Sequence, residues 1–562
     1  MTVYWVVWDG AAPWIAERLC RTGALPALSA LRKAGVTASA RVPSPNCQTP
    51  PSLATLFTGR WPAEHGVTGF TIPSAAEGGR VDDHASAFTP GVCRAPLVWE
   101  QVAEYGARSA LVHAPWVLSA AGTVEAHIDG AVEAYSRRIA RADALPLRTR
   151  CRAAWRVGPY ELAIASQENV VVSAGTQQVQ LIPDGNWRPL RLGDSSGVWL
   201  RAMSSARDRL LLRTGAWTRR VAGSNARLVD AFSRTPVFNG EGLGAMYRGG
   251  AFGARMAEGG DGSAEQVFLS SVECAARGFA TCADAALASH SADLVVIYLP
   301  MTDDLGHELA GWCDEISGAY RADIAPQLWR CLARGWGWAD RVLARVMRRA
   351  ERHDSVILSA DHGMVGMTHL VHLNRALVDA GLARIDGAGR LDAADSAAVY
   401  HPANNGSLWI NHERLAGGWV GLGDVASVQQ LALAALSAII DPATGRPVVA
   451  GYLGADGRPL PACDSESPVY VVLADDYQPS AELPPGEAVV RRARKTGAHV
   501  VNTGSDRLHA TLAAAGPGIP ADLNLGLVEN TLPAELVLDQ IRDSCSNGRR
   551  RARAECLTKV AA

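Results

Sequence analysis

The feature that most constrains this 562-residue chain is a set of short, continuous apolar runs that end in polar residues. Val3–Trp8 is the first, and Ser109–His113, Asp293–Tyr298 and Ser355–Ser359 follow a similar pattern. Such runs are typical of strands buried on both faces, because a strand with one solvated face alternates apolar and polar residues. The runs therefore predict a sheet that is covered on both sides.

Segments with helical spacing of apolar residues lie between these runs. Pro13–Ala34, Leu97–Tyr105 and Trp338–Glu351 are the predicted helices of this kind,. Val469–Leu473 and Ala510–Ala515 are candidate later strands. Alternating strands and helices predict an α/β fold with a mostly parallel central sheet and helices on both faces.

The texture of the sequence changes in the middle of the chain. Short β-like runs separated by Gly, Asn, Asp and Pro predict a small β-rich insert over residues 151–235,. We expect residues 1–150 and 236–540 to form the core. Residues 541–562 form a basic C-terminal tail, for which a solvated end is the simplest interpretation,.

Composition excludes several classes of function. The net charge of −2 gives no broad basic field for a nucleic acid polymer, and no apolar run reaches the roughly 18–20 residues of a membrane span,. The start of the chain has no secretory pattern, so we expect a cytoplasmic location. The 11 cysteines show no CxxC pair, which argues against a zinc finger or a disulfide framework,.

Acids and histidines follow several of the predicted strands. These candidate metal ligands are Asp9, Asp303, His307, Asp361, His362 and His499. In open α/β sheets ligands gather at the carboxyl ends of strands, and one helical turn would bring Asp303 and His307 to one face. A single acid of this kind is often only a helix N-cap, but the joint pattern suits two divalent ions, Zn²⁺ or Mn²⁺.

A threonine that precedes a predicted helix is the candidate nucleophile. Thr49 begins the stretch Thr49-Pro-Pro-Ser52, and a helix N-terminus favours anions,. A threonine hydroxyl is a weak nucleophile at neutral pH unless a bound dication lowers its pKa. The alternative is a threonine that only caps the helix.

These elements, in this order, resemble the type I phosphodiesterase/nucleotide pyrophosphatase family of the alkaline phosphatase superfamily. The resemblance spans nearly the whole chain and rests on five motifs: strand-Asp9-Gly, Thr49-Pro-Pro with Thr58-Gly-Arg-x-Pro-x-x-His65-Gly, Asp303-x-x-Gly-His307, Ser359-Ala-Asp361-His362-Gly-Met364, and Gly497-x-His499 with Ala515-Gly-Pro517. It implies an alkaline-phosphatase-like fold.

The resemblance also implies the roles of the site residues. One metal would be held by Asp9, Asp361, His362 and the Thr49 oxygen, and the other by Asp303, His307 and His499. Thr49 would attack phosphorus in line and form a phosphothreonine that water then hydrolyses. The implied enzyme is a two-metal phosphohydrolase that cleaves a phosphodiester or pyrophosphate of a nucleotide or nucleotide-linked metabolite, so its partner is a small phosphate ester.

The chain departs from the family pattern at two places. Ser52 stands where many relatives have an Asn that contacts a phosphate oxygen, and it keeps a shorter hydrogen-bond donor. Val500 replaces the usual Gly after the late histidine, so His509 and Asp506 remain alternatives to His499 as the last ligand.

Other functions stay open at this point. A phosphomonoesterase, a phosphonate hydrolase or a phosphomutase would use the same metals. A binding protein without turnover would be expected to lose a ligand or the nucleophile, whereas all seven positions carry competent side chains. Trp61 and Trp116 are candidates for stacking on a nucleobase, with core packing as the alternative,.

Overall fold

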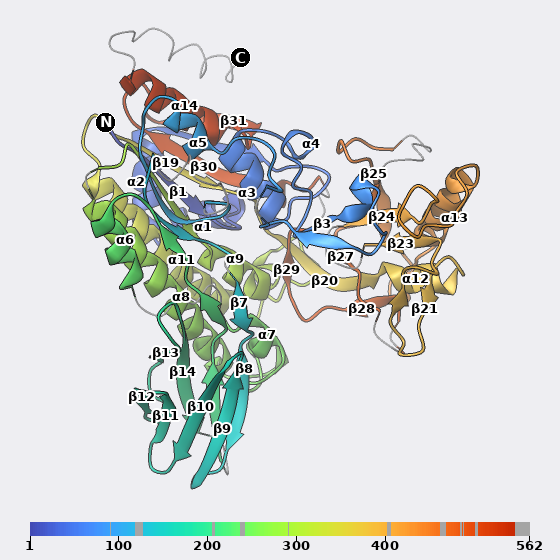
Figure 1. Ribbon diagram of the computed structural model, residues 1–562, viewed down its shortest axis with the longest axis horizontal. Coiled ribbons are helices and arrows are strands. Elements are labelled where there is room, and N and C mark those ends of the chain that lie inside the picture. The colour runs from blue at the N-terminus through green and yellow to red at the C-terminus, as the bar shows by residue number, and fades with distance from the viewer. Residues whose placement is uncertain are drawn as a thin grey trace.

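The computed structural model describes residues 1–89, 91–117, 127–135, 137–204, 208–235, 242–289, 291–401, 406–460, 468–483, 486, 488–500 and 504–545 (Figure 1). Its centre is a nine-stranded sheet in the order β17-β6-β5-β18-β1-β19-β30-β2-β31. Along the chain these strands are β1 (Val3–Trp8), β2 (Val36–Arg41), β5 (Ser109–Ala114), β6 (Ile128–Glu133), β17 (Val221–Ala222), β18 (Leu294–Leu299), β19 (Ser355–Ala360), β30 (Ala510–Ala515) and β31 (Leu523–Glu529).

Most neighbouring strands of this sheet run parallel. The run β6-β5-β18-β1-β19 is parallel throughout, and β31 is parallel to β2. β30 lies antiparallel between β19 and β2, and β17 is antiparallel to β6. The prediction of a mostly parallel central sheet in an α/β fold is confirmed.

Helices cover both faces of the sheet (Figure 1). One face carries α2 (Pro26–Ala34), α8 (Ser263–Ala288) and α11 (Ala325–Arg349), which contact one another or the strands beneath. The other carries α3 (Thr49–Thr58), α5 (Val98–Ala103) and α14 (Leu532–Cys545). Buried apolar side chains of the sheet and of both helix layers form one continuous core, in agreement with the uninterrupted apolar strands of the sequence,.

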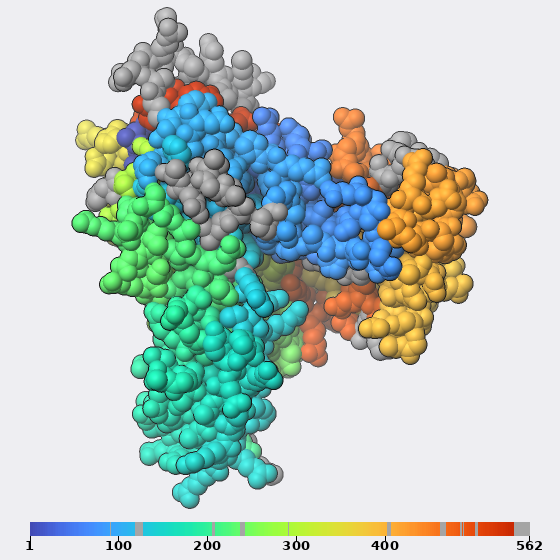
Figure 2. Space-filling model, in the orientation of Figure 1, coloured from blue at the N-terminus to red at the C-terminus, as the bar shows by residue number. Residues whose placement is uncertain are grey.

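Two smaller β-rich units project from this core, as Figure 2 shows. The first is the insert, whose strands are β7 (Arg138–Ala140), β8 (Asp143–Leu147), β9 (Cys151–Val157), β10 (Tyr160–Ser166), β11 (Val170–Ala174), β12 (Gln177–Leu181), β13 (Arg188–Arg191), β14 (Ser196–Ser204), β15 (Arg209–Arg213) and β16 (Ala216–Thr218). They form two small antiparallel sheets around a separate apolar cluster. The insert strands thus begin at Arg138 and end at Thr218, before β17 returns to the central sheet.

The second unit was not distinguished in the sequence. It contains β20 (Val365–His372), β23 (Ala398–Tyr400), β24 (Ser407–Ile410), β25 (Val449–Leu453), β26 (Val469–Leu473), β27 (Asp476–Ser480), β28 (Val490–Arg492), β29 (Gly497–Ala498), α12 (Leu373–Asp379) and α13 (Val425–Ser437). Its apolar side chains form a further cluster, so we call it the accessory unit.

The remaining elements are short. They are α1 (Pro13–Arg21), α4 (Pro62–His65), β3 (Thr71–Pro73), η1 (Ser74–Glu77), β4 (His84–Ser86), α6 (Ala226–Ser233), α7 (Gly244–Arg248), η3 (Met256–Glu258), α9 (Met301–Leu305), η4 (Gly306–Ala310), α10 (Gly311–Cys313), β21 (Arg384–Ile385), β22 (Leu391–Asp392) and η5 (Asp506–Leu508).

The structure differs from two sequence expectations. The single helix predicted over Pro13–Ala34 is two helices, because Gly23 adopts a left-handed φ of +75° and Pro26 starts a new helix without an N–H,. The predicted tail begins inside α14, which continues to Cys545, and residues 546–562 lie outside the described part of the chain. None of the helices in the described residues is both long and apolar enough to cross a membrane.

Candidate active site

The carboxyl ends of three adjacent parallel strands form the base of the candidate site. In the register of the sheet, Trp8 of β1 faces Leu299 of β18 on one side and Ala360 of β19 on the other. Asp9 follows β1 directly, and Asp361 follows β19 directly. Strands that end in register at one edge bring the residues after them together, as the sequence predicted.

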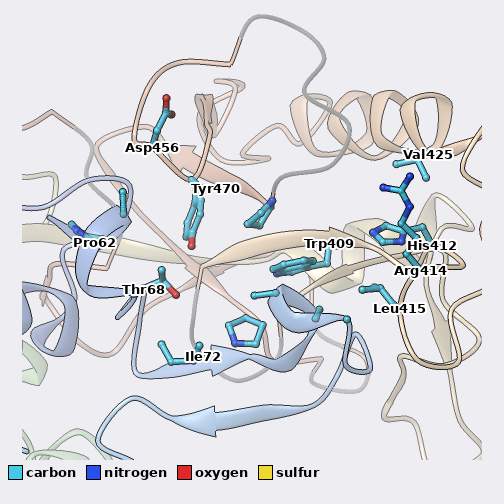
Figure 3. Close-up of a pocket in the computed structure, with 18 of the residues that line it drawn as sticks. Pro62, Thr68, Ile72, Trp409, His412, Arg414, Leu415, Val425, Asp456 and Tyr470 are labelled. Carbon is cyan, nitrogen blue, oxygen red and sulfur yellow. The ribbon is translucent and has the colours of Figure 1, made fainter. Parts of the chain in front are cut away.

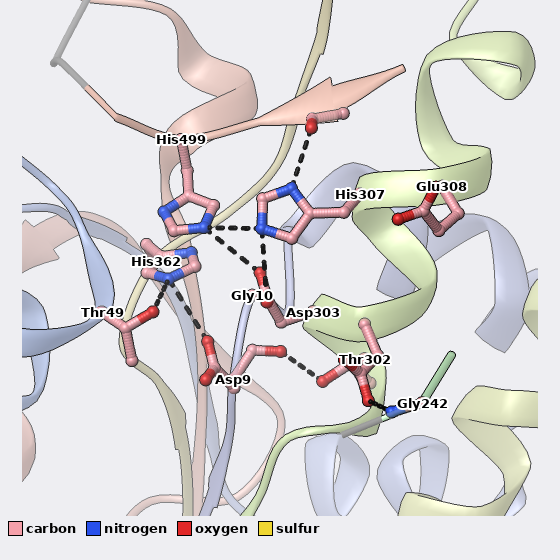
Figure 4. Close-up of polar contacts among 12 residues, drawn as sticks. Asp9, Gly10, Thr49, Gly242, Thr302, Asp303, His307, Glu308, His362 and His499 are labelled. Carbon is pink, nitrogen blue, oxygen red and sulfur yellow. Dashed lines mark hydrogen bonds and ion pairs between the residues drawn. The ribbon is translucent and has the colours of Figure 1, made fainter. Parts of the chain in front are cut away.

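The first group of side chains surrounds His362 (Figure 4). Its Nε2 atom lies 3.2 Å from Asp9 Oδ1, 3.3 Å from Asp361 Oδ2 and 3.3 Å from Thr49 Oγ1. The other oxygen of Asp361 accepts hydrogen bonds from the backbone N–H groups of Gly10 at 3.0 Å and His362 at 2.9 Å. Those bonds orient the carboxylate, so that Oδ2 points toward His362.

The second group is formed by Asp303, His307 and His499 (Figure 4). His307 Nε2 is 3.4 Å from Asp303 Oδ2, and His499 Nε2 is 3.3 Å from Asp303 Oδ1. Asp303 lies in α9, whereas His307 lies in the π-helical turn η4. Such turns are local irregularities that are frequent at functional sites. The ligand atoms of Asp9, Asp303 and His362 also lie within 4.8 Å of one another, so Asp303 lies in both groups.

Backbone carbonyls orient all three imidazoles. The Nδ1 atoms of His307, His362 and His499 lie 2.8, 2.9 and 3.3 Å from the carbonyl oxygens of Gly497, Gly363 and Cys47. A carbonyl can only accept, so each Nδ1 carries a proton, and in the neutral rings of His307 and His499 the lone pair lies on Nε2. The Nε2 atoms of His307 and His499 are 3.2 Å apart, and two lone pairs at that distance repel unless a cation or a shared proton lies between them.

Strand pairing in the accessory unit brings His499 to the site. β29 pairs antiparallel with β20, so that Ala498 faces Val365 shortly after the Asp361-His362 turn. The ring of His499 then stacks on that of His362, with the ring centroids 3.6 Å apart. Neither alternative from the sequence belongs to these groups of possible ligands among the described residues: His509 Nε2 is 3.8 Å from Asp506 Oδ1, and the Asp506 side chain is 94% exposed.

Burial and neighbouring charges move the pKa values of the cluster in opposite directions. Burial, with the nearby Asp9 carboxylate, raises the pKa of Asp361 well above its ordinary value. Burial disfavours a charged His362, but the carboxylates of Asp361 and Asp9 outweigh it and raise its pKa to about 10. Burial lowers the pKa of His307 and of His499, so both rings stay neutral near pH 7.

The donor set fits divalent cations. The buried atoms Asp9 Oδ1, Asp303 Oδ1 and Asp361 Oδ2 have no hydrogen-bond partner among the described residues, although buried carboxylate oxygens are normally paired,. Three imidazole nitrogens beside three carboxylates form a ligand set typical of Zn²⁺, which Mn²⁺ can also use. Buried charges are paired, neutralised by a shift of pKa, or compensated by a bound cation, and this donor set suits the last of these.

Thr49 starts α3 and is buried beside this cluster. The helix end offers fewer donors than the sequence suggested, because Pro50 and Pro51 have no N–H and the Ser52 N–H donates to the Gln48 carbonyl at 3.1 Å,. The Ser52 hydroxyl is fully buried one turn after Thr49 and has no hydrogen-bond partner among the described residues. No described residue therefore engages this donor.

A buried cysteine close to Thr49 is not a nucleophile. Cys47 lies two residues before Thr49 in the sequence and is fully buried. Burial raises the pKa of its thiol to about 12, so it carries no thiolate at neutral pH,. Its carbonyl instead orients His499.

A pocket of about 440 Å³ opens beside Thr49, and we call it the catalytic pocket. Besides the acids Asp9, Asp303 and Asp304, its lining is largely aromatic and comes from Phe70, Phe88, Tyr135, Trp217, Phe279 and Tyr298. Arg138 and Trp217 belong to the insert, and the Arg138 guanidinium lies 5.3 Å from the Trp217 ring centre.

The aromatic wall was missed in the sequence, because its residues come from separate loops and strands with no shared period. Only Tyr298, at the end of a predicted strand, had a positional signal. Trp116 packs behind the wall against Phe88, with ring centroids 5.6 Å apart, and Trp61 caps α4. Neither is among the residues that line the pocket.

An α/β sheet with acids and imidazoles at its carboxyl edge, beside a buried threonine, defines the class of metal-dependent hydrolases. The sequence profile of the type I phosphodiesterase / nucleotide pyrophosphatase family matches residues 3–432. The chain belongs to this family of metal-dependent hydrolases, and the family predicted from the motifs is confirmed.

The chain is also similar to solved structures of other proteins. Phosphonoacetate hydrolase from Sinorhizobium meliloti 1021 aligns with a TM-score of 0.46 and 13% identity over 96% of each chain. Human ectonucleotide pyrophosphatase / phosphodiesterase 5 aligns with a TM-score of 0.46 and 11% identity over 96% of this chain and 95% of that chain. No curated protein matches the chain.

Proposed function

We propose that this protein hydrolyses a phosphodiester or pyrophosphate bond of a nucleotide or nucleotide-linked metabolite, with Thr49 as the nucleophile. The observation that carries the proposal is the convergence of three imidazoles, two of them buried and that of His307 partly exposed, with three carboxylates beside Thr49. The Thr49 hydroxyl is 3.3 Å from His362 Nε2. A hydroxyl in that position can attack the phosphorus atom of a phosphate ester once its proton is removed.

In this proposal the two groups of side chains hold two divalent cations. The first ion takes Asp9, Asp361, His362 and the Thr49 oxygen. The second takes Asp303, His307 and His499. We propose Zn²⁺ because three of the ligands are imidazoles, with Mn²⁺ as the alternative. When bound, the cations supply Lewis-acid stabilisation of charge on the phosphoryl and threonine oxygens.

The chain's own residues then carry a double displacement. Thr49 Oγ forms a bond to phosphorus and gives its proton to water. The bond from phosphorus to the leaving oxygen breaks, and that oxygen keeps the electron pair and takes up a proton from water. The Ser52 hydroxyl donates to a phosphoryl oxygen of the resulting phosphothreonine. Water then attacks phosphorus and releases a proton, the bond to Thr49 Oγ breaks, Thr49 Oγ takes up a proton, and the phosphate monoester product leaves.

The catalytic pocket supports a substrate with a flat aromatic group. Phe88 and Tyr135 lie stacked on one wall, with ring centroids 4.3 Å apart, and stacking on aromatic side chains is a common way to hold a nucleobase,. Arg138 at the pocket edge suits a second anionic group of the substrate,. The cytoplasmic location stays a prediction from the sequence.

The experiment is a hydrolysis assay on a panel of esters with and without a chelator. The panel contains bis-p-nitrophenyl phosphate, a nucleoside 5′-monophosphate p-nitrophenyl ester, p-nitrophenyl phosphate and phosphonoacetate. We expect the nucleotide diester to have the highest kcat/KM and the chelator to abolish turnover. Preference for the monoester or for phosphonoacetate would replace the proposal by a phosphomonoesterase or a phosphonate hydrolase.

Thr49→Ala tests the nucleophile. We expect kcat to fall at least ~10³-fold, or about 4 kcal/mol, while metal content stays largely intact because the other ligands remain. Thr281→Ala is the matched control, because Thr281 is an exposed helical threonine whose hydroxyl donates only to the carbonyl of Arg277. Acid-quenched wild type should carry on Thr49 a phosphoryl group that is still esterified to the retained part of the substrate, and the absence of this adduct under turnover would contradict the covalent step.

A further inference from the structure

One ligand carboxylate of the site is tied to a pair of tyrosines. Asp9 Oδ2 accepts a hydrogen bond from the Tyr298 hydroxyl, which is also in contact with the Tyr135 hydroxyl. Tyr135 Oη itself lies 3.3 Å from the same Asp9 oxygen. The opposite oxygen, Asp9 Oδ1, faces His362 Nε2 at 3.2 Å and has no hydrogen bond from a described residue.

The backbone of Asp9 is fixed by the same segment of chain. Its N–H donates to the carbonyl of Leu299 at 3.0 Å, and its carbonyl accepts from the Thr302 hydroxyl (Figure 4). Tyr298, Leu299 and Thr302 all precede Asp303 closely. The segment that carries one candidate ligand therefore orients another, and the two side-chain groups are mechanically joined.

Tyr135 connects this arrangement to the substrate pocket. Its ring lies parallel to Phe88 in the pocket wall, at an interplanar angle of 7°. Its backbone adopts a left-handed φ of +51°, which is rare for residues other than glycine and persists where surrounding contacts require it,. Tyr298 is only 1% exposed and lies between Tyr135 and Phe279.

We propose that Tyr298 and Tyr135 are positioning residues for a metal ligand: they hold Asp9 Oδ2, so that Oδ1 alone is presented to a divalent cation. The inference rests on the proposed function for the identity of the ligand set. A carboxylate with one oxygen engaged by phenols binds in a single orientation, and such outer partners typically change metal affinity about 10–100-fold. Because Tyr135 also forms the pocket wall, the same pair links substrate binding to ligand geometry.

The test compares Tyr298→Phe and Tyr135→Phe with Tyr477→Phe. Tyr477 is the matched control, because its hydroxyl also donates to a buried carboxylate, that of Asp441, but within the accessory unit and away from the site. Each protein is stripped of metal and titrated with Zn²⁺ against a chromophoric chelator, without substrate. The absorption spectrum of the Co²⁺-loaded proteins reports the ligand geometry.

We expect Tyr298→Phe to weaken one of the two Zn²⁺ affinities by about 10–100-fold and to change the Co²⁺ spectrum. Tyr135→Phe should act in the same direction with a smaller effect, and Tyr477→Phe should match wild type. In steady-state assays of the site variants, kcat should fall by a larger factor than KM rises. If both site variants bind Zn²⁺ within twofold of wild type with unchanged Co²⁺ spectra, the proposal is overturned.

The remaining outcomes are also decisive. If Tyr298→Phe does not fold, Tyr135→Phe carries the comparison, because its half-buried ring keeps its contact with Phe88. A wild type that binds two cations but hydrolyses no ester of the panel would overturn the proposed function and leave the tyrosine pair supported by the titrations. A wild type that binds no cation would overturn both.

Discussion

Two pockets of this molecule invite comparison: the catalytic pocket and a second pocket between the core and the accessory unit. The second pocket is the larger, at about 640 Å³ against about 440 Å³. Trp409 lies near its centre, with His412 and Arg414 on one side and Asp456 on the other (Figure 3). We call it the interlobe pocket.

The two pockets differ in how their polar groups are satisfied. In the interlobe pocket Arg94 lies 3.6 Å from Glu77, and the Trp409 indole donates to Ser407 at 2.8 Å. In the catalytic pocket the Asp9 and Asp303 carboxylates each have a buried oxygen without a hydrogen-bond partner among the described residues. The comparison teaches that clustered carboxylate oxygens without hydrogen-bond partners, rather than volume, mark the reactive site,.

The largest expected effect comes from a ligand that keeps its shape. Asp361→Asn preserves Oδ1, which accepts from the Gly10 and His362 N–H groups, but replaces the ligand oxygen Oδ2 by an amide nitrogen. We expect kcat/KM to fall about 10³-fold, equivalent to about 4 kcal/mol, with little change in Tm. Steady-state kinetics and metal analysis check this. Unchanged turnover would show that Asp361 is not part of the catalytic site.

The next effect tests the aromatic wall. Phe88→Ala removes the ring that stacks on Tyr135, and we expect KM for a nucleotide diester to rise about 10-fold, since stacking on one aromatic side chain contributes about 1–3 kcal/mol,. The matched control is Trp409→Phe in the interlobe pocket, which should leave KM unchanged. Equal effects of both variants would contradict the assignment of the substrate to the catalytic pocket.

A buried histidine between the two pockets predicts an acid sensitivity of folding. His65 Nδ1 accepts from the Val67 N–H at 3.1 Å, its Nε2 lies 3.1 Å from Thr55 Oγ1, and burial lowers its pKa to about 3. Its contribution to stability is complete above pH 6.5, the ordinary value, and is lost as the pH falls below 6.5, because the unfolded chain takes up the proton first.

The measurement is the free energy of unfolding in urea between pH 7 and pH 4.5, with chelator present. We expect wild type to lose up to about 1.4 kcal/mol more per pH unit below pH 6.5 than His65→Gln, which is less stable at pH 7 but does not titrate. Parallel pH profiles of the two proteins would show that His65 is not buried in the neutral form.

The smallest effect is expected in the interlobe pocket. Leu422 lines it and is 39% exposed, so Leu422→Ser should change the free energy of unfolding by no more than about 0.5 kcal/mol and turnover by less than about twofold,. A larger loss of kcat/KM would break the comparison, because the interlobe pocket would then take part in substrate binding.

The central sheet was largely predictable from the sequence. Val3–Trp8 forms β1 with the predicted bounds, and Asp9, Asp303 and Asp361 follow β1, β18 and β19 as expected. Local pattern was enough because strands buried on both faces must be apolar throughout. Pro13–Ala34 was wrong as one helix, because periodicity alone underweighted Gly23 and Pro26.

The accessory unit and the aromatic wall were not predictable in the same way. The strands of the accessory unit are short and lie among loops, so they carry little periodic signal. Phe70, Phe88, Tyr135 and Trp217 come from separate parts of the chain, and nothing local indicates that they face one pocket. Their meeting depends on long-range contacts that single-sequence patterns do not encode.

By itself the sequence determined the family, the candidate nucleophile and the side chains able to hold metal, because those are properties of residue type and spacing along one strand or turn. Only the tertiary structure decided which late residue reaches the cluster: β29 pairs with β20 and brings His499 against His362, whereas His509 lies beside the exposed Asp506. It also decided how the ligands are oriented, through the carbonyls behind each imidazole and the tyrosines behind Asp9. Orientation is set by partners distant in sequence, and folding alone brings those partners together.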